Sequence, residues 1–226
     1  SLFTNFVARI MSMLIFDGVE NLKELINPVL TIGTFDGIHL GHQKIIKNLI
    51  REAKSTNSDS VLLTFFPHPR MVLFPEDTNL QLIQTQEEKY NKLAEQGLQN
   101  IIVQPFSKEF AKLTALEFIE EIIVKKIRAK KIIIGYDHQF GNSREGNINF
   151  LREYSDKFGY EVIEIPAKEI DEINVSSTKI RTAINEGDIE TANLFLNAAF
   201  EINGTVVHGN EIGRSIDFPT ANIQIA

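Results

Sequence analysis

Short, largely apolar runs alternate along this chain with longer segments in which apolar residues recur every three or four positions. The runs cover residues 29–32, 60–65, 100–103, 131–135 and 161–165. Runs of this kind are typical of strands buried on both faces of a parallel sheet. The segments between them have the spacing of helices that pack one face on such a sheet. The pattern therefore predicts an α/β fold, in which helices cover both faces of a parallel sheet.

The turn after the first run is rich in glycine and carries two histidines. Gly33, Gly37 and Gly41 permit the chain to turn sharply from the strand into a helix. The start of that helix directs unpaired N–H groups and the positive end of its dipole above the sheet edge, which suits a phosphate group. His39 and His42 are three residues apart, so both imidazoles can donate hydrogen bonds to one phosphate. The turn therefore favours a nucleotide phosphate site.

Two other interpretations of this turn remain open on spacing alone. It could be a tight turn whose histidines satisfy only local hydrogen bonds, or a zinc site formed by His-x-x-His. The chain has no cysteine and no obvious third ligand nearby, which disfavours zinc. Neither common phosphate-loop signature, G-x-x-x-x-G-K-[ST] or G-x-G-x-x-G, follows this strand. The histidines would therefore take the role that a lysine has in other phosphate sites.

Composition narrows the choice of partner and compartment. The formal net charge of −7 disfavours nucleic acid and anionic membranes as partners, and an anionic substrate would need a local positive patch. The absence of cysteine excludes disulfides and fits a reducing compartment. Because Arg9 interrupts the apolar N-terminal stretch, we expect no signal peptide and no membrane span, and a cytoplasmic location.

Three further segments place polar residues near the ends of predicted strands or helices. The two prolines of residues 66–70, FPHPR, argue against a helix and predict an ordered loop at the end of a strand. Asp137 follows the run 131–135 and reaches the same sheet edge, where ligands of open α/β sheets bind. Residues 176–178 predict a helix start that is either a simple cap or, with Lys179 and Arg181, a second phosphate site.

Residues 33–42, GTFDGIHLGH, resemble the G-x-F-D-x-x-H-x-G-H motif of the HxGH nucleotidyltransferases. Within that superfamily the chain is most similar to the bacterial bifunctional riboflavin kinase/FAD synthetases, because further motifs follow in family order. Residues 65–69 match F-x-P-H-P, residues 135–141 resemble G-x-D-F-x-F-G, and residues 175–181 resemble I-S-S-T-x-x-R. The chain departs from these motifs at His138, where an aromatic residue is usual, and at Val175, where isoleucine is usual.

The resemblance implies a Rossmann-like nucleotidyltransferase that transfers AMP from ATP to FMN, giving FAD and pyrophosphate. It implies ATP as co-substrate, Mg²⁺ as cofactor, and FMN and riboflavin as the other small-molecule substrates. It also implies roles for particular residues: His39, His42 and Arg181 would be catalytic; Gly33, Thr34, Phe35, Asp36, Gly41, Ser176, Ser177 and Thr178 would bind the nucleotide; and Phe66, Pro67, His68, Asp137 and Phe140 would bind the flavin or line its site.

The last part of the chain changes from βα units to a pattern of strands and turns. Residues 200–223 resemble the opening of a riboflavin kinase domain, with Asp217 in place of the usual glycine, and the resemblance implies that Thr220 and Asn222 bind ATP and Mg²⁺ there. We therefore expect a nucleotidyltransferase domain over 1–186, a connecting helix over 187–199 and an incomplete kinase domain over 200–226. Because a barrel of six strands cannot close in so few residues, we expect kinase activity only in a longer chain.

Two alternatives to this assignment remain at the level of sequence. The chain could be a different HxGH adenylyl- or cytidylyltransferase, which the Phe-x-Pro-His-Pro loop and the kinase-like tail disfavour. It could also be a flavin- or nucleotide-binding module without catalysis, which the intact His39, His42 and Arg181 disfavour.

Overall fold

The computed structural model describes residues 7–10, 12–77, 80–166, 175–208, 217–218 and 220–225. Its centre is a seven-stranded sheet in the order β1-β2-β5-β4-β3-β6-β7. Strands β2 to β7 are parallel, and β1 pairs antiparallel with β2 at one edge. The strands are β1 Val7–Ile10, β2 Met13–Asp17, β3 Val29–Ile32, β4 Ser60–Phe66, β5 Asn100–Pro105, β6 Lys131–Gly135 and β7 Glu161–Ile165. The predicted parallel sheet is confirmed, but β1 and β2 were not predicted.

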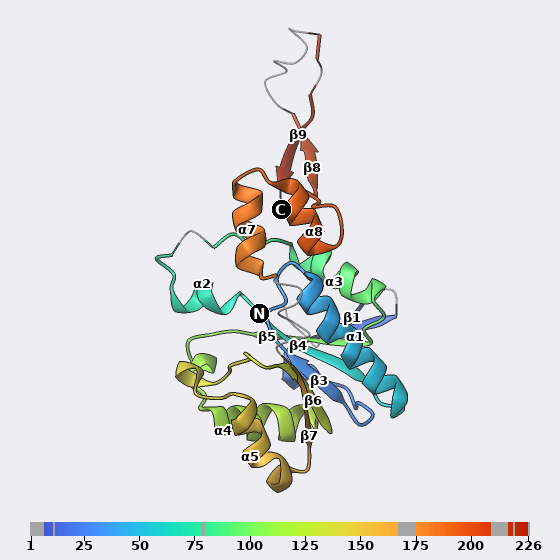
Figure 1. Ribbon diagram of the computed structural model, residues 1–226, viewed down its shortest axis with the longest axis vertical. Coiled ribbons are helices and arrows are strands. Elements are labelled where there is room, and N and C mark those ends of the chain that lie inside the picture. Colours follow the sequence, from blue (N-terminus) through green and yellow to red (C-terminus); the bar gives the residue numbers. More distant parts are fainter. Residues whose placement is uncertain are drawn as a thin grey trace.

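Helices cover both faces of the sheet, as the hydrophobic spacing predicts (Figure 1). On one face, α1 (Leu40–Ser55) and α3 (Gln86–Glu95) bury residues such as Leu49 and Leu93 against strand residues such as Leu62. On the other face lie α5 (Ile148–Phe158) and a helix that starts as α4 (Ala115–Glu117) and continues as a π-helix over Phe118–Ile127. Short 3₁₀ turns occur at Val19–Asn21, Phe110–Lys112 and Asn142–Arg144.

The proline-containing segment after β4 is not a loop throughout. A short helix, α2, covers Pro69–Leu73, with His68 as its N-cap. The His68 Nδ1 atom accepts a hydrogen bond from the Arg70 N–H at 3.2 Å. The sequence prediction was wrong here, because a proline at the first position of a helix lacks only an N–H group that has no partner in the helix.

The neighbouring strands β3 and β6 separate at their carboxyl ends. They pair only through Val29 with Lys131 and Leu30 with Ile132, although β3 continues to Ile32 and β6 to Gly135. The chain runs from β3 outward to β4 and β5, and then crosses back to β6 on the other side of β3. This reversal is the switch point at which open α/β sheets bind their ligands.

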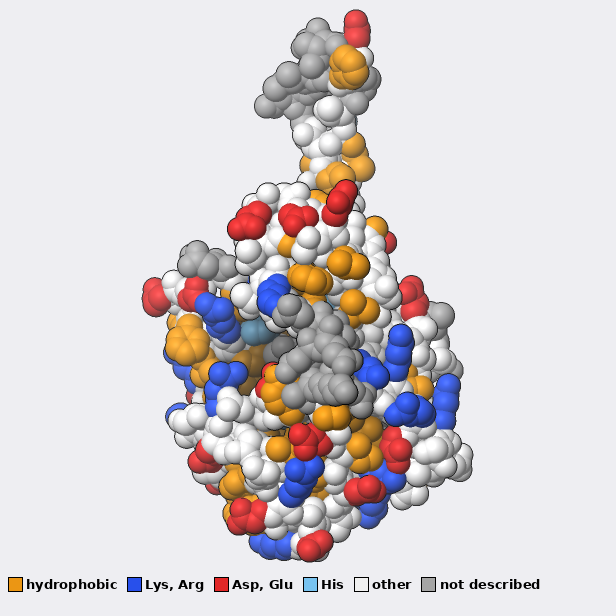
Figure 2. Space-filling model, in the orientation of Figure 1, with side chains coloured by type: hydrophobic (Ala, Val, Ile, Leu, Met, Phe, Trp, Pro, Cys, Tyr) orange, Lys and Arg blue, Asp and Glu red, His pale blue; other side chains and the backbone are white. Residues whose placement is uncertain are grey.

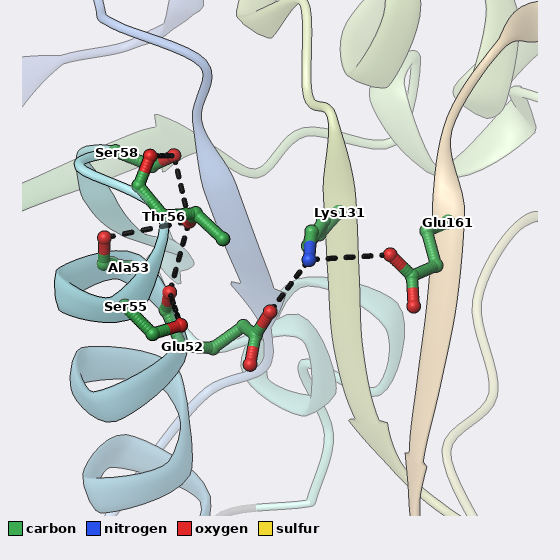
Figure 3. A network of polar contacts seen from close by, with 7 residues as sticks. All are labelled: Glu52, Ala53, Ser55, Thr56, Ser58, Lys131 and Glu161. Atoms are coloured by element: carbon green, nitrogen blue, oxygen red, sulfur yellow. Dashed lines mark hydrogen bonds and ion pairs between the residues drawn. The ribbon is translucent and has the colours of Figure 1, made fainter.

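The opposite, amino end of the same strands is closed by polar contacts (Figure 3). Lys131 Nζ at the start of β6 lies 2.6 Å from Glu52 Oε1 of α1 and 3.3 Å from Glu161 Oε2 of β7. In the last turn of α1 the Thr56 hydroxyl donates to the Glu52 carbonyl at 2.9 Å. These contacts hold α1, β6 and β7 together where the sheet does not open.

Two helices after β7 dock above the carboxyl end of the sheet. Helices α7 (Ser177–Asn185) and α8 (Ile189–Leu196) share a small apolar cluster with Ile83. Gln43 Nε2 of α1 donates to the Leu196 carbonyl at 3.0 Å, which ties α8 to α1. Strands β8 (Gly204–Val207) and β9 (Asn222–Ile225) form a separate antiparallel pair that projects beyond α8 (Figure 1). None of the helices described is long and apolar enough to cross a membrane.

Candidate functional site

The glycine-rich turn between β3 and α1 has an unusual backbone. Phe35 and Ile38 adopt positive φ angles of 50° and 40°, beside Gly37 at 90°. A positive φ is unfavourable for a β-branched residue such as Ile38, and such residues concentrate at functional sites. The Phe35 ring folds over Gly33 so closely that a Cβ at position 33 would lie 2.8 Å from it. A side chain at position 33 would therefore have to displace the Phe35 ring.

The two histidines of the turn stack on one another at the start of α1. Their ring centroids are 3.6 Å apart, and the Phe35 ring lies 4.6 Å from that of His42. His39 is the N-cap, and its Nδ1 accepts the backbone N–H of His42 at 3.3 Å. A neutral His39 therefore carries its proton on Nε2. His42 Nδ1 is buried without a hydrogen-bond partner among the described residues, so this turn contains an unsatisfied polar atom, which is uncommon in a protein interior.

Burial keeps both histidines neutral at physiological pH. Burial lowers the pKa of His39 to about 4. Burial, together with repulsion from His39 and Lys89, lowers the pKa of His42 well below 6.5. Since neither ring is protonated near pH 7, each offers a neutral N–H donor and not a positive charge. Any positive charge at the site must come from other residues.

Replacing His39 with asparagine is expected to weaken the pH dependence of folding. Asparagine keeps an N-cap acceptor but does not titrate. The pKa of His39 falls from 6.5 to about 4 on folding, so its contribution to stability is complete above 6.5 and declines as pH falls toward 4. Between pH 7 and 5 the free energy of unfolding should therefore fall by about 2 kcal/mol more in the wild type than in His39→Asn. This figure follows from 1.36 kcal/mol for each pKa unit.

Urea unfolding at pH 7, 6 and 5 measures this difference. The contributions of His68 and His138 are common to both proteins and cancel in the comparison, whereas His42, whose ring stacks on His39, is coupled to the substitution. Equal losses of stability in the two proteins would contradict the lowered pKa of His39.

Helix α7 is fastened to the glycine-rich turn through Asp36. Arg181 Nη1 lies 2.7 Å from Asp36 Oδ2, and the Ile83 N–H donates to Asp36 Oδ1 at 2.9 Å. The Ser177 hydroxyl donates to the Asp36 carbonyl at 2.8 Å. Burial raises the pKa of Asp36, although the Ile83 N–H, Arg181 and Lys89 oppose that shift. Two motifs about 140 residues apart in sequence are therefore joined, and Arg181 reaches the site from α7.

A set of cations surrounds His68, on the segment after β4. Burial lowers the pKa of His68 to about 4, and the positive charges of Arg181, Lys89 and Arg70 lower it further. Figure 2 shows a histidine side chain set among lysine and arginine side chains on this face of the molecule. Two of these cations have carboxylate partners, since Arg181 pairs with Asp36 and Arg70 Nη2 lies 2.6 Å from Asp77 Oδ2, whereas the hydrogen bonds of Lys89 go to uncharged oxygens.

Lys89 of α3 belongs to this cluster, and the motifs in the sequence did not indicate it. It is 5% exposed, and its Nζ donates to the Thr34 carbonyl at 3.2 Å and the Thr64 hydroxyl at 3.4 Å. Helical spacing could have indicated that Lys89 is buried, because it lies four residues before the buried Leu93 and therefore on the same face of α3.

The remaining candidate residues are less closely grouped. Ser176 is the N-cap of α7 and accepts the Lys179 N–H at 3.3 Å, while Thr178 is exposed.

The residues expected at the flavin and in the kinase segment lie apart from this helix start. Asp137 is exposed after β6, whereas the Phe140 ring is 8% exposed and packs in the hydrophobic core. Phe66 is 45% exposed at the end of β4, and Pro67 follows it. Thr220 and Asn222 are exposed near and in β9, which projects away from the sheet (Figure 1).

Comparison with known proteins identifies the family. A model of FAD synthetase matches residues 22–179, which include the glycine-rich turn, the His68 segment and the start of α7. The chain belongs to the FAD synthetase family. A model of riboflavin kinase matches residues 196–226.

Curated relatives agree with this membership in the FAD synthetase family. The bifunctional riboflavin kinase/FMN adenylyltransferase of Buchnera aphidicola subsp. Acyrthosiphon pisum is 38% identical over 95% of this chain and 68% of its own length. The Escherichia coli K12 protein of the same name is 34% identical over 94% of this chain and 68% of its own. The protein of the same name from Listeria monocytogenes is 36% identical over 88% of this chain and 63% of its own length.

A solved structure shares the fold of this FAD synthetase family member. It is described as a macrolide-efflux protein from Streptococcus pneumoniae, and it superposes with a TM-score of 0.83 at 34% identity. The match covers 95% of this chain and 69% of the other. The similarity therefore extends from the sheet through α7 and α8.

Proposed function

We propose that this chain transfers AMP from ATP to FMN, producing FAD and pyrophosphate. The observation that carries the proposal is the pair of stacked, neutral histidines at the start of α1, beside the Arg181 that α7 delivers to the same turn. This arrangement lies at the carboxyl end of a parallel sheet, next to the switch point between β3 and β6. Membership in the FAD synthetase family supports FMN as the acceptor.

In the proposed reaction an oxygen of the FMN phosphate attacks the α-phosphorus of ATP in line. The new P–O bond forms as the bond from the α-phosphorus to the bridging oxygen breaks, and the electron pair leaves with pyrophosphate. An FMN phosphate is largely ionised near pH 7, so the attacking oxygen needs no strong general base. The protein then has to align the two phosphates and offset the charge that develops on them.

The chain's own residues suit these two tasks. His39 and His42 would donate neutral N–H groups to phosphate oxygens at the reacting centre. Ser177, Thr178 and Arg181 would hold the leaving pyrophosphate at the start of α7, where the helix dipole also favours an anion. Gly33, Thr34 and Gly41 would let backbone approach the nucleotide, with Phe35, Asp36 and Ser176 shaping the turn and the helix start. His68 and Asp137 would position the flavin nucleotide, together with the exposed Phe66 and Pro67.

Two of the flavin and metal assignments have specific structural consequences. Because the Phe140 ring is in the core, we propose that it supports the Asp137 loop from below. No cluster of three His, Cys, Asp or Glu that could hold a metal ion occurs among the described residues. We therefore propose that Mg²⁺ arrives as the complex of ATP, bound mainly by phosphate oxygens, which is its usual mode in such sites.

The domain organisation is proposed on the same basis. Residues 1–186 would form the nucleotidyltransferase domain and 187–199, which contain α8, the connection. Residues 200–226 would begin a riboflavin kinase domain in which Thr220 and Asn222 bind ATP and Mg²⁺, and the match of the riboflavin kinase model to residues 196–226 supports this.

The function is tested by incubating the chain with FMN, ATP and MgCl₂ and separating the products by chromatography. We expect FAD and pyrophosphate in equal amounts. A parallel tube with riboflavin in place of FMN separates adenylyl transfer from riboflavin phosphorylation. If FMN and ATP remain unchanged under conditions in which the protein is folded, the proposed transfer is wrong.

A further inference from the structure

Asp36 and Lys89 are the only buried residues among the lysines, arginines, aspartates and glutamates whose burial the structure describes. Asp36 has Arg181 as its ion-pair partner. No carboxylate of the described residues lies within ion-pair distance of Lys89, and both hydrogen bonds of its ammonium go to uncharged oxygens. Taking an ammonium out of water costs several kcal/mol, so an unpaired buried lysine calls for an explanation.

The position of this ammonium relates it to the transfer site. Its two acceptors are the Thr34 carbonyl, just after β3, and the Thr64 hydroxyl in β4, so it bridges two adjacent strands below the glycine-rich turn. The Thr64 hydroxyl also donates to the Thr34 carbonyl at 3.2 Å. The Thr34 carbonyl is therefore held by two donors, and its position fixes where the turn to His39 begins.

The charge on Lys89 also acts on the groups around it. It contributes to the lowered pKa values of His42 and His68, after burial as the main cause, and it opposes the raised pKa of Asp36. Burial lowers the pKa of Lys89 itself to about 8, and Asp36 limits that shift, so the ammonium persists near pH 7. The charge of Lys89 thus acts on three segments that converge on the site. Its ammonium has three N–H donors, of which Thr34 and Thr64 accept two, so one remains for a further acceptor.

We propose that Lys89 is a positioning residue for the proposed adenylyl transfer: its ammonium holds the Thr34 carbonyl, and thereby the turn that carries His39 and His42, and places a fixed positive charge beneath the phosphate groups of ATP. The inference rests on the function proposed above. The missing counter-ion of Lys89 is then the polyphosphate of the nucleotide. Lysine stands here on α3, far in sequence from the turn it supports, in a protein whose turn contains no lysine.

The absence of cysteine from the chain permits a clean test of the charge. In Lys89→Cys the single thiol is alkylated in denaturant and the protein is refolded. Aminoethylation restores a side chain of lysine length with an ammonium, whereas propylation gives an uncharged side chain of similar length. Wild-type protein taken through the same steps controls for refolding.

We expect the propylated protein, and Lys89→Met, to show a kcat for FAD formation lower by about 100-fold, the loss typical of one electrostatic contact in the transition state. We expect the KM for FMN to change little, and the aminoethylated protein to recover to within about 10-fold of wild type. Equal activity of the aminoethylated and propylated proteins, whether high or low, would overturn the proposal. Lys92→Met removes the same charge from α3 at a partly exposed position and should keep the wild-type kcat.

A second measurement does not depend on turnover. The pKa of His68 is followed by NMR in the wild type, Lys89→Met and Lys92→Met. Since a nearby cation disfavours the imidazolium, the pKa of His68 should rise in Lys89→Met alone. An unchanged His68 pKa would show that the charge of Lys89 does not reach the site.

Binding separates a failure of this inference from a failure of the proposed function. If the wild type forms no FAD, the proposed adenylyl transfer is wrong. The role of Lys89 is then tested by calorimetric titration of the variants with ATP and with inorganic pyrophosphate. Weaker binding by Lys89→Met than by Lys92→Met would then support the charge beneath the phosphates. Equal binding by the two variants would overturn it.

Discussion

His42→Ala is expected to lower the kcat for FAD formation by about 100- to 1,000-fold, the loss that follows removal of one transition-state hydrogen-bond donor. His42 lies between His39 and Phe35 in the stack, and its Nδ1 is buried without a hydrogen-bond partner among the described residues. The KM for ATP should change only modestly, because the donor acts mainly as charge develops in the transition state. Steady-state assays with FMN and ATP measure both quantities.

Two further variants separate the donor from the packing of the ring. His42→Phe keeps an aromatic ring in the stack but has no N–H, so it should be as inactive as His42→Ala. His208→Ala removes an exposed histidine at the end of β8 and should leave FAD formation unchanged. Wild-type rates in His42→Ala or His42→Phe would contradict the donor role.

Arg181→Met is expected to lower the free energy of unfolding by about 3 kcal/mol, because it leaves the Asp36 carboxylate buried without its cation. Asp36 is 7% exposed and the Arg181 side chain 19% exposed, so water screens this pair little. The variant should also lose FAD formation, since Arg181 would hold the pyrophosphate. Urea unfolding at pH 7 measures the stability, and the chromatographic assay measures the transfer.

The pH dependence of this variant provides an internal check. Burial already raises the pKa of Asp36, and loss of Arg181 should raise it further. A folded-state pKa above the unfolded value favours folding at low pH and loses that contribution as pH rises through the folded pKa. The stability deficit of Arg181→Met should therefore be smaller at pH 4.5 than at pH 7.

An exposed pair serves as the control for this prediction. Arg152 Nη2 lies 2.8 Å from Glu164 Oε2, but the two side chains are 48% and 31% exposed. Arg152→Met should therefore cost less than about 1 kcal/mol. In addition, Asp36→Asn combined with Arg181→Met should cost less than the sum of the two single changes, because the neutral amide needs no cation. Additive losses would show that the pair is not coupled.

Local sequence patterns predicted much of the fold correctly. The runs 29–32, 131–135 and 161–165 match β3, β6 and β7 in their bounds. For β3 and β6 the reason is that a strand buried on both faces is apolar along most of its length, whereas β7 is an edge strand that begins at the exposed Glu161. The expected helix start at residues 176–178 is confirmed by the Ser176 cap of α7. The expectation that proline excludes a helix failed at Pro69, because this proline is the first residue of α2, where a helix tolerates it.

The candidate site was only partly predictable from sequence. His39, His42 and Arg181 lie in recognisable motifs, so their chemistry could be proposed before their geometry was known. Lys89 lies outside every motif. Helical spacing places it on the buried face of α3, but only the packing of α3 over β3 and β4 brings its ammonium to Thr34 and Thr64. Phe140 resembles a flavin contact in sequence, but its ring packs in the core.

The sequence by itself determined the α/β architecture, the family and the types of residue available for phosphate chemistry, because periodicity, caps and glycine turns are local properties of the chain. The tertiary structure alone decided that Arg181 pairs with Asp36, that the two stacked histidines are buried and their pKa values lowered, and that the buried Lys89 ammonium donates to the Thr34 carbonyl. The ion pair and the contacts of Lys89 join distant segments, whereas the stack joins residues three positions apart that the surrounding structure buries. Burial and the neighbouring charges set the protonation of each group there, and neither can be read from the residue alone.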